Sequence, residues 1–180
     1  MKSKLGYIEE SAKVYEFAKI INKNNFSLGI NSQIDDFVFI NAGKMCVIGD
    51  FVHVSSFSSI IGGGEFSINN FSGISAGCRI ITGSDDFSGS FLSNPTVPSK
   101  YKNVKCGKIK IGKHCILGSN SIVLPDIEIP DGVTIGAGSV VKKELKPWTI
   151  YAGFTPKKVG ERSQDGIIEL EYKLRKELGI

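Results

Sequence analysis

Histidine and cysteine are scarce in this chain, which has two histidines and four cysteines among 180 residues. No two cysteines have the spacing of a CxxC motif, so neither a zinc site nor a disulfide framework is expected. We expect a cytoplasmic protein without a bound metal, whose reduced thiols fill small buried gaps. The residues concerned are His53, His114, Cys46, Cys78, Cys106 and Cys115.

Long hydrophobic runs are also missing, and the charges are nearly balanced. No segment approaches the roughly 18 apolar residues of a membrane span, and no apolar stretch typical of a secretory signal follows the N-terminal lysines. The net charge of +4 suits small anionic ligands but is too weak to indicate a nucleic-acid partner.

Glycine is abundant, with 21 residues against 6 prolines, and much of it lies within a repeat of six residues. An aliphatic residue opens nearly every unit, and a small or polar residue usually follows it. Such a period is neither helical nor a simple strand alternation, and it fits a short strand followed by a sharp corner. The clearest units read IGDFVH, VSSFSS, INNFSG, ISAGCR, IGKHCI, LGSNSI, IPDGVT and IGAGSV.

Three such units make one triangular coil of about 18 residues, whose opening aliphatic residues stack inside. Because each coil buries its inner face only against its neighbours, several coils are needed, and we count roughly six or seven between Val14 and Lys146. The sequence therefore predicts an all-β fold, a parallel β-helix.

Two interruptions of the repeat define the predicted organisation, and the shorter one, GGGE at Gly62 to Glu65, adds two residues to a corner. The segment at 82–108 breaks the phase, is rich in Ser, Asn, Pro and Gly, and is expected to be a functional loop. Residues 1–150 are predicted to form the β-helix domain, and residues 151–180 an extension with an amphipathic helix that caps the solenoid end. The apolar stripe of that helix would contain Ile167, Leu170 or Glu171, Leu174 and Leu178.

The run IGAGSVVKKELKPWTIYAGFTPKKVG at 135–160 resembles the final-coil signature of the hexapeptide-repeat acyltransferases, with a small departure at 154–158. The resemblance covers 34–162, and GDFVHVSSF and ITGSDDFSG are most similar to the sugar-modifying branch. It implies a left-handed β-helix, acetyl-CoA as co-substrate, and a homotrimer. The acceptor sugar or nucleotide sugar would bind between subunits, where the long loop of one meets the coils of another.

In galactoside-type relatives the general base is a histidine near the start of the long loop, where this chain has Asp85 and Asp86. Histidine suits that role because its pKa lies near neutral pH. Counting coil to coil places His53 in a column with Gly73 and Ile116, and Ile116 takes a place where some relatives carry an acceptor-binding tryptophan. We predict His53 as the general base; the alternative is a surface or inter-subunit histidine that moves no proton.

His114 is fourth in its hexad and is expected at a solvated outward corner, which makes it the weaker candidate for the base. Polar loop residues would bind the acceptor, and the aspartates could instead orient His53 from an adjacent subunit or cap turns. The predicted acceptor-binding residues are Asp85, Asp86, Asn94, Tyr101 and Ile116.

For the co-substrate, the family implies small residues that leave backbone groups open to the pantetheine arm, although the corners of the repeat require small residues anyway. These residues are Gly118, Ser119, Gly136 and Ala137. A basic cluster would hold the phosphates of CoA, unless it is only a solvated face; it comprises Lys142, Lys143, Lys157, Lys158 and Arg162. Trp148 would stack near the adenine or pack the C-terminal segment.

The sequence therefore predicts an acetyl-CoA-dependent sugar O-acetyltransferase of surface-polysaccharide synthesis. The alternative is an N-acetyltransferase acting on a nucleotide-linked amino sugar, because an amine of low pKa needs less help from a base than a hydroxyl group does. A zinc lyase like the γ-class carbonic anhydrases would need three histidines. A non-catalytic trimeric scaffold is disfavoured by the intact co-substrate signature.

Overall fold

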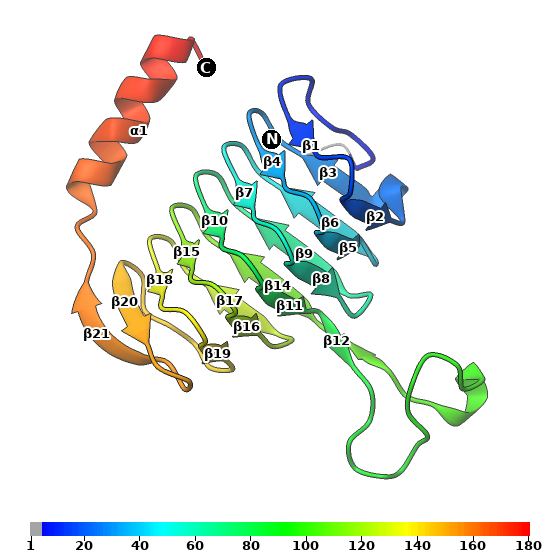
Figure 1. The fold of residues 1–180 in the computed structure, drawn as a ribbon. Helices are drawn as coiled ribbons and strands as arrows, with labels where there is room; N and C mark the ends of the chain where they lie inside the picture. The colour runs from blue at the N-terminus through cyan, green and yellow to red at the C-terminus, as the bar shows by residue number, and fades with distance from the viewer. Residues whose placement is uncertain (1–4) are drawn as a thin grey trace.

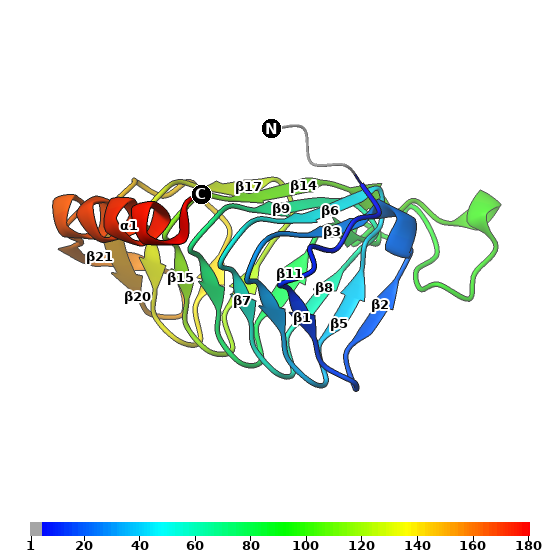
Figure 2. The same ribbon diagram turned by 90° about the horizontal axis from the view of Figure 1, so that it is seen from above.

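Short parallel strands wind into a solenoid of about seven turns in the computed structural model, which describes residues 5–180 (Figure 1). This architecture confirms the predicted parallel β-helix with an inserted loop and a C-terminal helix. Three parallel sheets form its three faces (Figure 2). The start of the predicted domain, residues 1–4, lies outside the described part of the chain.

The three sheets are numbered here by their size, and each takes one strand from successive turns. Sheet 1 contains β1 (Lys13–Val14), β4 (Gln33–Ile34), β7 (His53–Val54), β10 (Gly73–Ile74), β15 (Ile116–Leu117), β18 (Thr134–Ile135), β20 (Thr149–Ala152) and β21 (Lys157–Glu161). The last strand, β21, turns back and pairs with β20 in the antiparallel direction. Sheet 2 contains β2 (Lys19–Ile21), β5 (Phe39–Asn41), β8 (Ser59–Ile61), β11 (Arg79–Ile81), β16 (Ile122–Val123) and β19 (Val140–Val141). Sheet 3 contains β3 (Phe26–Leu28), β6 (Met45–Ile48), β9 (Glu65–Ile68), β14 (Lys108–Ile111) and β17 (Ile127–Ile129).

Inward-facing apolar residues stack turn upon turn to form one continuous core, as the repeat predicted. Alternate residues of each strand point inward because side chains of a strand alternate between its two faces. The buried column of sheet 1 consists of Ile34, Val54, Ile74, Leu117 and Ile135. One of the two buried columns of sheet 3 consists of Phe26, Cys46, Phe66, Ile109 and Ile127.

The turns of the solenoid differ in length, and the predicted 18 residues hold only for the later ones. Gln33 pairs with His53, a repeat of 20 residues, whereas Ile116 pairs with Thr134, a repeat of 18. The two extra residues lie at the corner between sheets 2 and 3, called corner 2–3. There the backbone at Gly62 has a φ of 111°, and a Cβ atom would come within 2.2 Å of the next turn, so only glycine fits.

The segment at 82–108 leaves the solenoid at this corner and projects away from it (Figure 1). Its base is an antiparallel pair formed by β12 (Gly83–Ser84) and β13 (Lys105–Cys106), and it contains the 3-10 turn η2 (Ser99–Tyr101). A second such turn, η1 (Lys23–Asn25), lies between β2 and β3.

The helix α1 (Asp165–Leu178) lies along the corner between sheets 3 and 1, called corner 3–1, and not over the solenoid end as the sequence suggested (Figures 1 and 2). Its inward stripe explains the difference, because Glu171 and Arg175 contact His114 and Phe71 of inner turns. The predicted apolar stripe is instead largely exposed at Leu170, Leu174 and Leu178. No helix within residues 5–180 is long and apolar enough to cross a membrane.

Candidate active site

His53 lies on the outer face of sheet 1, where its side chain is 51% exposed and contacts a carboxylate. Its Nε2 atom is 2.9 Å from Oδ2 of Asp35, and Oδ1 of Asp35 accepts a hydrogen bond of 2.7 Å from the amide of Gln33. Although burial raises the pKa of Asp35, the hydrogen bonds from Gln33 and His53 outweigh it and lower that pKa. The carboxylate is therefore ionised at neutral pH.

An open notch separates His53 from Ile116 on the surface of sheet 1. The register places His53 beside Gly73, Gly73 beside Ile116, and Ile116 beside Thr134, which confirms the predicted column. Adjacent strands are about 4.8 Å apart, so His53 and Ile116 are separated by roughly 10 Å. Gly73 has no side chain to fill this gap, and a Cβ atom there would meet nothing within 4 Å.

Small residues follow the strands of sheet 1 beside this notch, at the corner toward sheet 2, called corner 1–2. The turns that carry Gly118, Ser119, Gly136 and Ala137 are stacked directly on one another. The N–H groups of both glycines are bonded to the following turn. Within residues 5–180, the N–H of Ser119 and both backbone groups of Ala137 have no such partner, so these groups can bond a ligand.

The predicted acceptor-binding residues of the loop do not meet His53 within one chain. The loop leaves from corner 2–3 (Figure 1), whereas His53 belongs to β7 of sheet 1 and its side chain is exposed there. Asp85 accepts a hydrogen bond of 3.2 Å from the N–H of Asn94. Asp86 accepts one of 2.9 Å from a serine hydroxyl two residues ahead, which lowers its pKa. Within one chain, the two aspartates therefore cap turns of the loop. Tyr101 is exposed.

The four lysines of the predicted basic cluster lie near the last turn of the solenoid. Lys142 and Lys143 line a hollow of 110 Å³ together with Pro156. Lys157 and Lys158, which follow that proline, begin β21. These lysines remain candidates for contact with phosphates.

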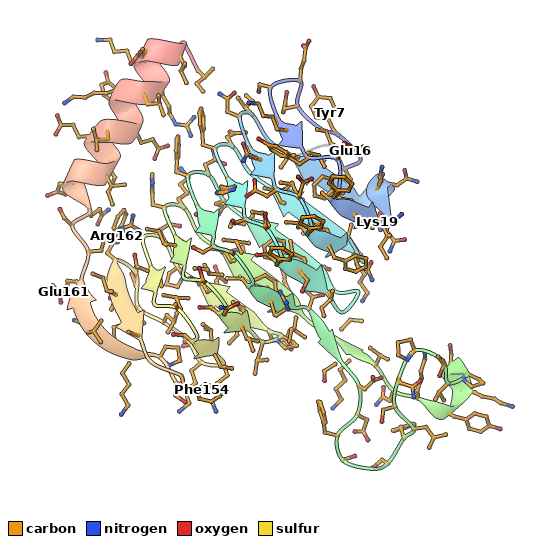
Figure 3. The ribbon with its side chains drawn as sticks, viewed as in Figure 1. Tyr7, Glu16, Lys19, Phe154, Glu161 and Arg162 are labelled. Atoms are coloured by element: carbon orange, nitrogen blue, oxygen red, sulfur yellow. The ribbon has the colours of Figure 1, made fainter. Side chains whose placement is uncertain are left out.

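Arg162 and Trp148 have partners elsewhere. The Nη1 atom of Arg162 donates hydrogen bonds to the carbonyl oxygens of His114 and Gly132, and Arg162 lies far from Phe154 at the tip of the β20–β21 hairpin (Figure 3). The indole of Trp148 covers Gly132, where a Cβ atom would come within 2.3 Å of the ring. Trp148 thus packs the C-terminal segment, and Arg162 does not join the lysine cluster.

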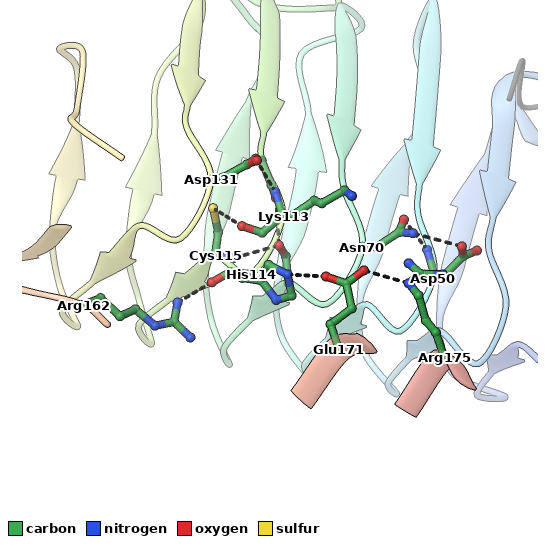
Figure 4. Close-up of polar contacts among 11 residues, drawn as sticks. Asp50, Asn70, Lys113, His114, Cys115, Asp131, Arg162, Glu171 and Arg175 are labelled. Carbon is green, nitrogen blue, oxygen red and sulfur yellow. Dashed lines mark hydrogen bonds and ion pairs between the residues drawn. The ribbon is translucent and has the colours of Figure 1, made fainter. Parts of the chain in front are cut away.

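The expectation of a solvated corner for His114 is wrong. The residue is 7% exposed, and its ring lies between those of Phe71 and Trp148, at centroid distances of 5.4 and 6.0 Å. Its Nε2 is 2.6 Å from Oε2 of Glu171, whose Oε1 accepts a 2.7 Å hydrogen bond from Arg175 (Figure 4). Although burial raises the pKa of Glu171, these hydrogen bonds lower it overall. The pair anchors α1 against the solenoid and lines a hollow of about 370 Å³ beside that helix.

Asp35 is the site residue that the sequence analysis missed. Its signal was present in the repeat, because IDDFVF and VSSFSS occupy equivalent positions in successive turns. Aligning whole turns would have placed Gln33 beside His53 and Asp35 beside Ser55. Reading hexads one at a time concealed this contact, which joins residues 18 apart.

Three of the four cysteines are buried, as predicted for small core residues, and Cys106 is exposed. Burial raises the pKa of the thiols of Cys46 and Cys78, and raises that of Cys115 to about 11. These thiols are therefore poor nucleophiles. Among residues 5–180, no group of His, Cys, Asp and Glu side chains is arranged to hold a metal ion.

Comparisons with known proteins agree with this geometry. Residues 108–143 match the family model described as bacterial transferase hexapeptide (six repeats). A dTDP-4-amino-4,6-dideoxy-D-glucose acyltransferase of Escherichia coli is 40% identical over 91% of this chain and 85% of its own length. The putative lipopolysaccharide biosynthesis O-acetyl transferase WbbJ of Escherichia coli K12 is 30% identical over 74% of this chain and 67% of its own.

A solved structure of AntD, an N-acyltransferase from Bacillus cereus, in complex with dTDP and 3-hydroxybutyryl-CoA has a TM-score of 0.88 to this chain. The two are 36% identical, and the match covers 98% of this chain and 93% of AntD. A variant of AntD has also been solved with dTDP-4-amino-4,6-dideoxyglucose and coenzyme A.

The six-residue solenoid, its long loop and these similarities define an acyl-CoA-dependent acyltransferase. The chain belongs to the hexapeptide-repeat acyltransferase family. Within that family, the N-acyltransferases of dTDP-linked amino sugars are more similar to it than the sugar O-acetyltransferases are.

Proposed function

We propose that this protein transfers an acyl group from acyl-CoA to the amino group of a dTDP-linked 4-amino-4,6-dideoxy sugar. The observation that carries the proposal is the 40% identity, over 91% of the chain, to the Escherichia coli acyltransferase of that sugar class. The ligands bound to AntD support it. The first prediction from the sequence, sugar O-acetylation, has weaker support, because WbbJ is less similar over a shorter span.

The chemistry requires one base and a set of hydrogen-bond donors. The acceptor amine attacks the thioester carbonyl, a C–N bond forms, and the C–S bond breaks to release the CoA thiolate. His53 takes the proton of the attacking amine and returns it to the departing sulfur. Backbone N–H groups beside the notch, such as that of Ser119, hold the developing oxyanion.

We propose that the active enzyme is a homotrimer whose sites form between subunits, because one chain leaves its loop far from His53. Phe17, Phe37 and Phe57 stack at corner 1–2 with ring centroids 5.7 and 5.2 Å apart. All three side chains are more than half exposed, and a continuous apolar ridge of this kind is typical of an interface. Subunits joined along this ridge would place the loop of one near sheet 1 of the next.

The substitution Phe37→Glu tests this assembly. A carboxylate in the middle of the ridge would be buried without a partner in the trimer, which would destabilise each interface by about 3–5 kcal/mol. We expect the variant to sediment as a monomer at micromolar concentration. The matched control is Leu170→Glu on the outer side of α1, which adds the same charge to an exposed apolar residue and should leave the trimer intact. A trimeric Phe37→Glu protein would place the interface elsewhere.

The acceptor class is tested by measuring CoA release with paired acceptors. We expect turnover with acetyl-CoA or 3-hydroxybutyryl-CoA and dTDP-4-amino-4,6-dideoxyglucose, and none when dTDP-6-deoxyglucose, which has a hydroxyl at C4, replaces the amino sugar. Comparing the two donors determines the acyl group, which the sequence alone predicted to be acetyl. Turnover with the hydroxyl acceptor and not with the amine would restore the O-acetyltransferase hypothesis.

A further inference from the structure

Asp35 belongs to the turn before that of His53, yet its side chain reaches the imidazole. The contact is 2.9 Å between Oδ2 and Nε2, and the other carboxylate oxygen is held at 2.7 Å by Gln33. The Asp35 side chain is 21% exposed against 51% for that of His53. Two consecutive hydrogen bonds thus link the amide of Gln33, the carboxylate of Asp35 and the imidazole of His53.

The contact with Asp35 determines which ring nitrogen of His53 carries the hydrogen atom. An ionised carboxylate can only accept hydrogen bonds, so Nε2 of His53 must donate and Nδ1 keeps its lone pair. The residue in register on the other side of His53 is Gly73, which has no side chain to hold the ring. Nδ1 is therefore free to meet a substrate in the notch.

His114 provides an internal comparison. It also has a carboxylate on Nε2, that of Glu171 at 2.6 Å. Its ring, however, is buried between two aromatic rings under α1. The same pairing therefore anchors a helix in one case and leaves a basic nitrogen exposed in the other.

We propose that Asp35 is a positioning residue that holds His53 with Nε2 protonated, so that Nδ1 accepts the proton of the acceptor amine. This inference rests on the proposed role of His53. When Nδ1 takes the proton, the imidazolium forms beside a carboxylate that stabilises its charge, and Asp35 itself stays ionised. Nδ1 then returns the proton to the CoA thiolate, so that the resting ring is restored.

The substitution Asp35→Asn tests the proposal with little change in shape. The amide carries no charge to stabilise the imidazolium and no longer favours the Nε2–H form. We expect kcat with acetyl-CoA and dTDP-4-amino-4,6-dideoxyglucose to fall about 10²–10⁴-fold, while KM for both substrates changes little. Asp35→Glu keeps the charge and should recover part of the lost kcat.

Asp36→Asn is the matched control, because it removes a neighbouring carboxylate that accepts the N–H of Phe17 at 2.8 Å and forms no hydrogen bond with His53. The asparagine oxygen can still accept that bond, so kcat should stay within about twofold of wild type.

Nitrogen NMR of the imidazole separates this inference from the proposed function. The chain has two histidines, so a His53→Gln sample assigns both rings. We expect a protonated Nε2 on His53 in the wild type and a loss of that preference in Asp35→Asn. An unchanged tautomer and kcat in Asp35→Asn, with an inactive His53→Gln, would overturn the role of Asp35 alone. Full activity of His53→Gln would show that His53 is not the general base, and Asp35 would then have no base to position.

Discussion

The substitution His53→Gln should lower kcat by about 10²–10⁴-fold, the usual contribution of a positioned general acid–base. Glutamine keeps a polar side chain of similar length that can still contact Asp35, but it cannot take up a proton at neutral pH. His53 lies on an exposed strand surface and is not part of the buried core, so the fold should persist. Steady-state rates with acetyl-CoA and dTDP-4-amino-4,6-dideoxyglucose measure the effect.

The control for this prediction is the other histidine. His114→Gln removes a buried ring from between Phe71 and Trp148 and weakens the bond to Glu171. We expect the free energy of unfolding to fall by about 1–3 kcal/mol, with kcat of the folded protein little changed. The opposite outcome, with activity lost through His114 and retained without His53, would show that the base is assigned to the wrong residue.

The substitution Phe66→Ala should lower the free energy of unfolding by about 3–5 kcal/mol. Phe66 is 1% exposed and lies between Cys46 and Ile109 in the core column of sheet 3. Each turn buries its inner face only against its neighbours, so nothing else can fill the resulting cavity. Chemical denaturation at one fixed protein concentration measures the change, since association of subunits would add to the apparent stability.

Two further variants make this measurement specific to core volume. Phe66→Leu keeps most of the buried volume and should cost less than about 1.5 kcal/mol. Phe87→Ala removes the same ring from the loop, where the residue is 93% exposed, and should change stability by no more than about 0.5 kcal/mol. Equal losses for the two Phe66 variants would contradict a cavity as the cause.

The fold was predictable because one rule acts in every turn. Ile34, Val54 and Ile74 must point inward wherever the strand begins, since the alternation along a strand has a period of two. The repeat therefore predicted the column of His53 with Gly73 and Ile116. It indicated two extra residues only at Gly62 to Glu65, whereas each turn before the loop has 20 residues, because extra residues at corner 2–3 lengthen a turn without disturbing its inward positions.

The candidate site was predictable only in part, because the repeat says where a residue faces and not what it touches. His53 could be placed on an outer face by counting, but the Asp35 carboxylate at its Nε2 depends on side-chain geometry. His114 has the sequence context of a solvated corner. It is buried because α1, some 57 residues further along, folds back along corner 3–1.

The sequence by itself determined that this chain is a six-residue solenoid with a long loop, because burial of one aliphatic residue per hexad is a local and repeated requirement. It also placed His53 on an outer face, in one column with Gly73 and Ile116. Only the tertiary structure decided that Asp35 holds His53, that Glu171 anchors α1, and that Arg162 bonds the backbone and not the lysine cluster. Such contacts join residues far apart in the chain, and no local pattern of burial specifies their distances.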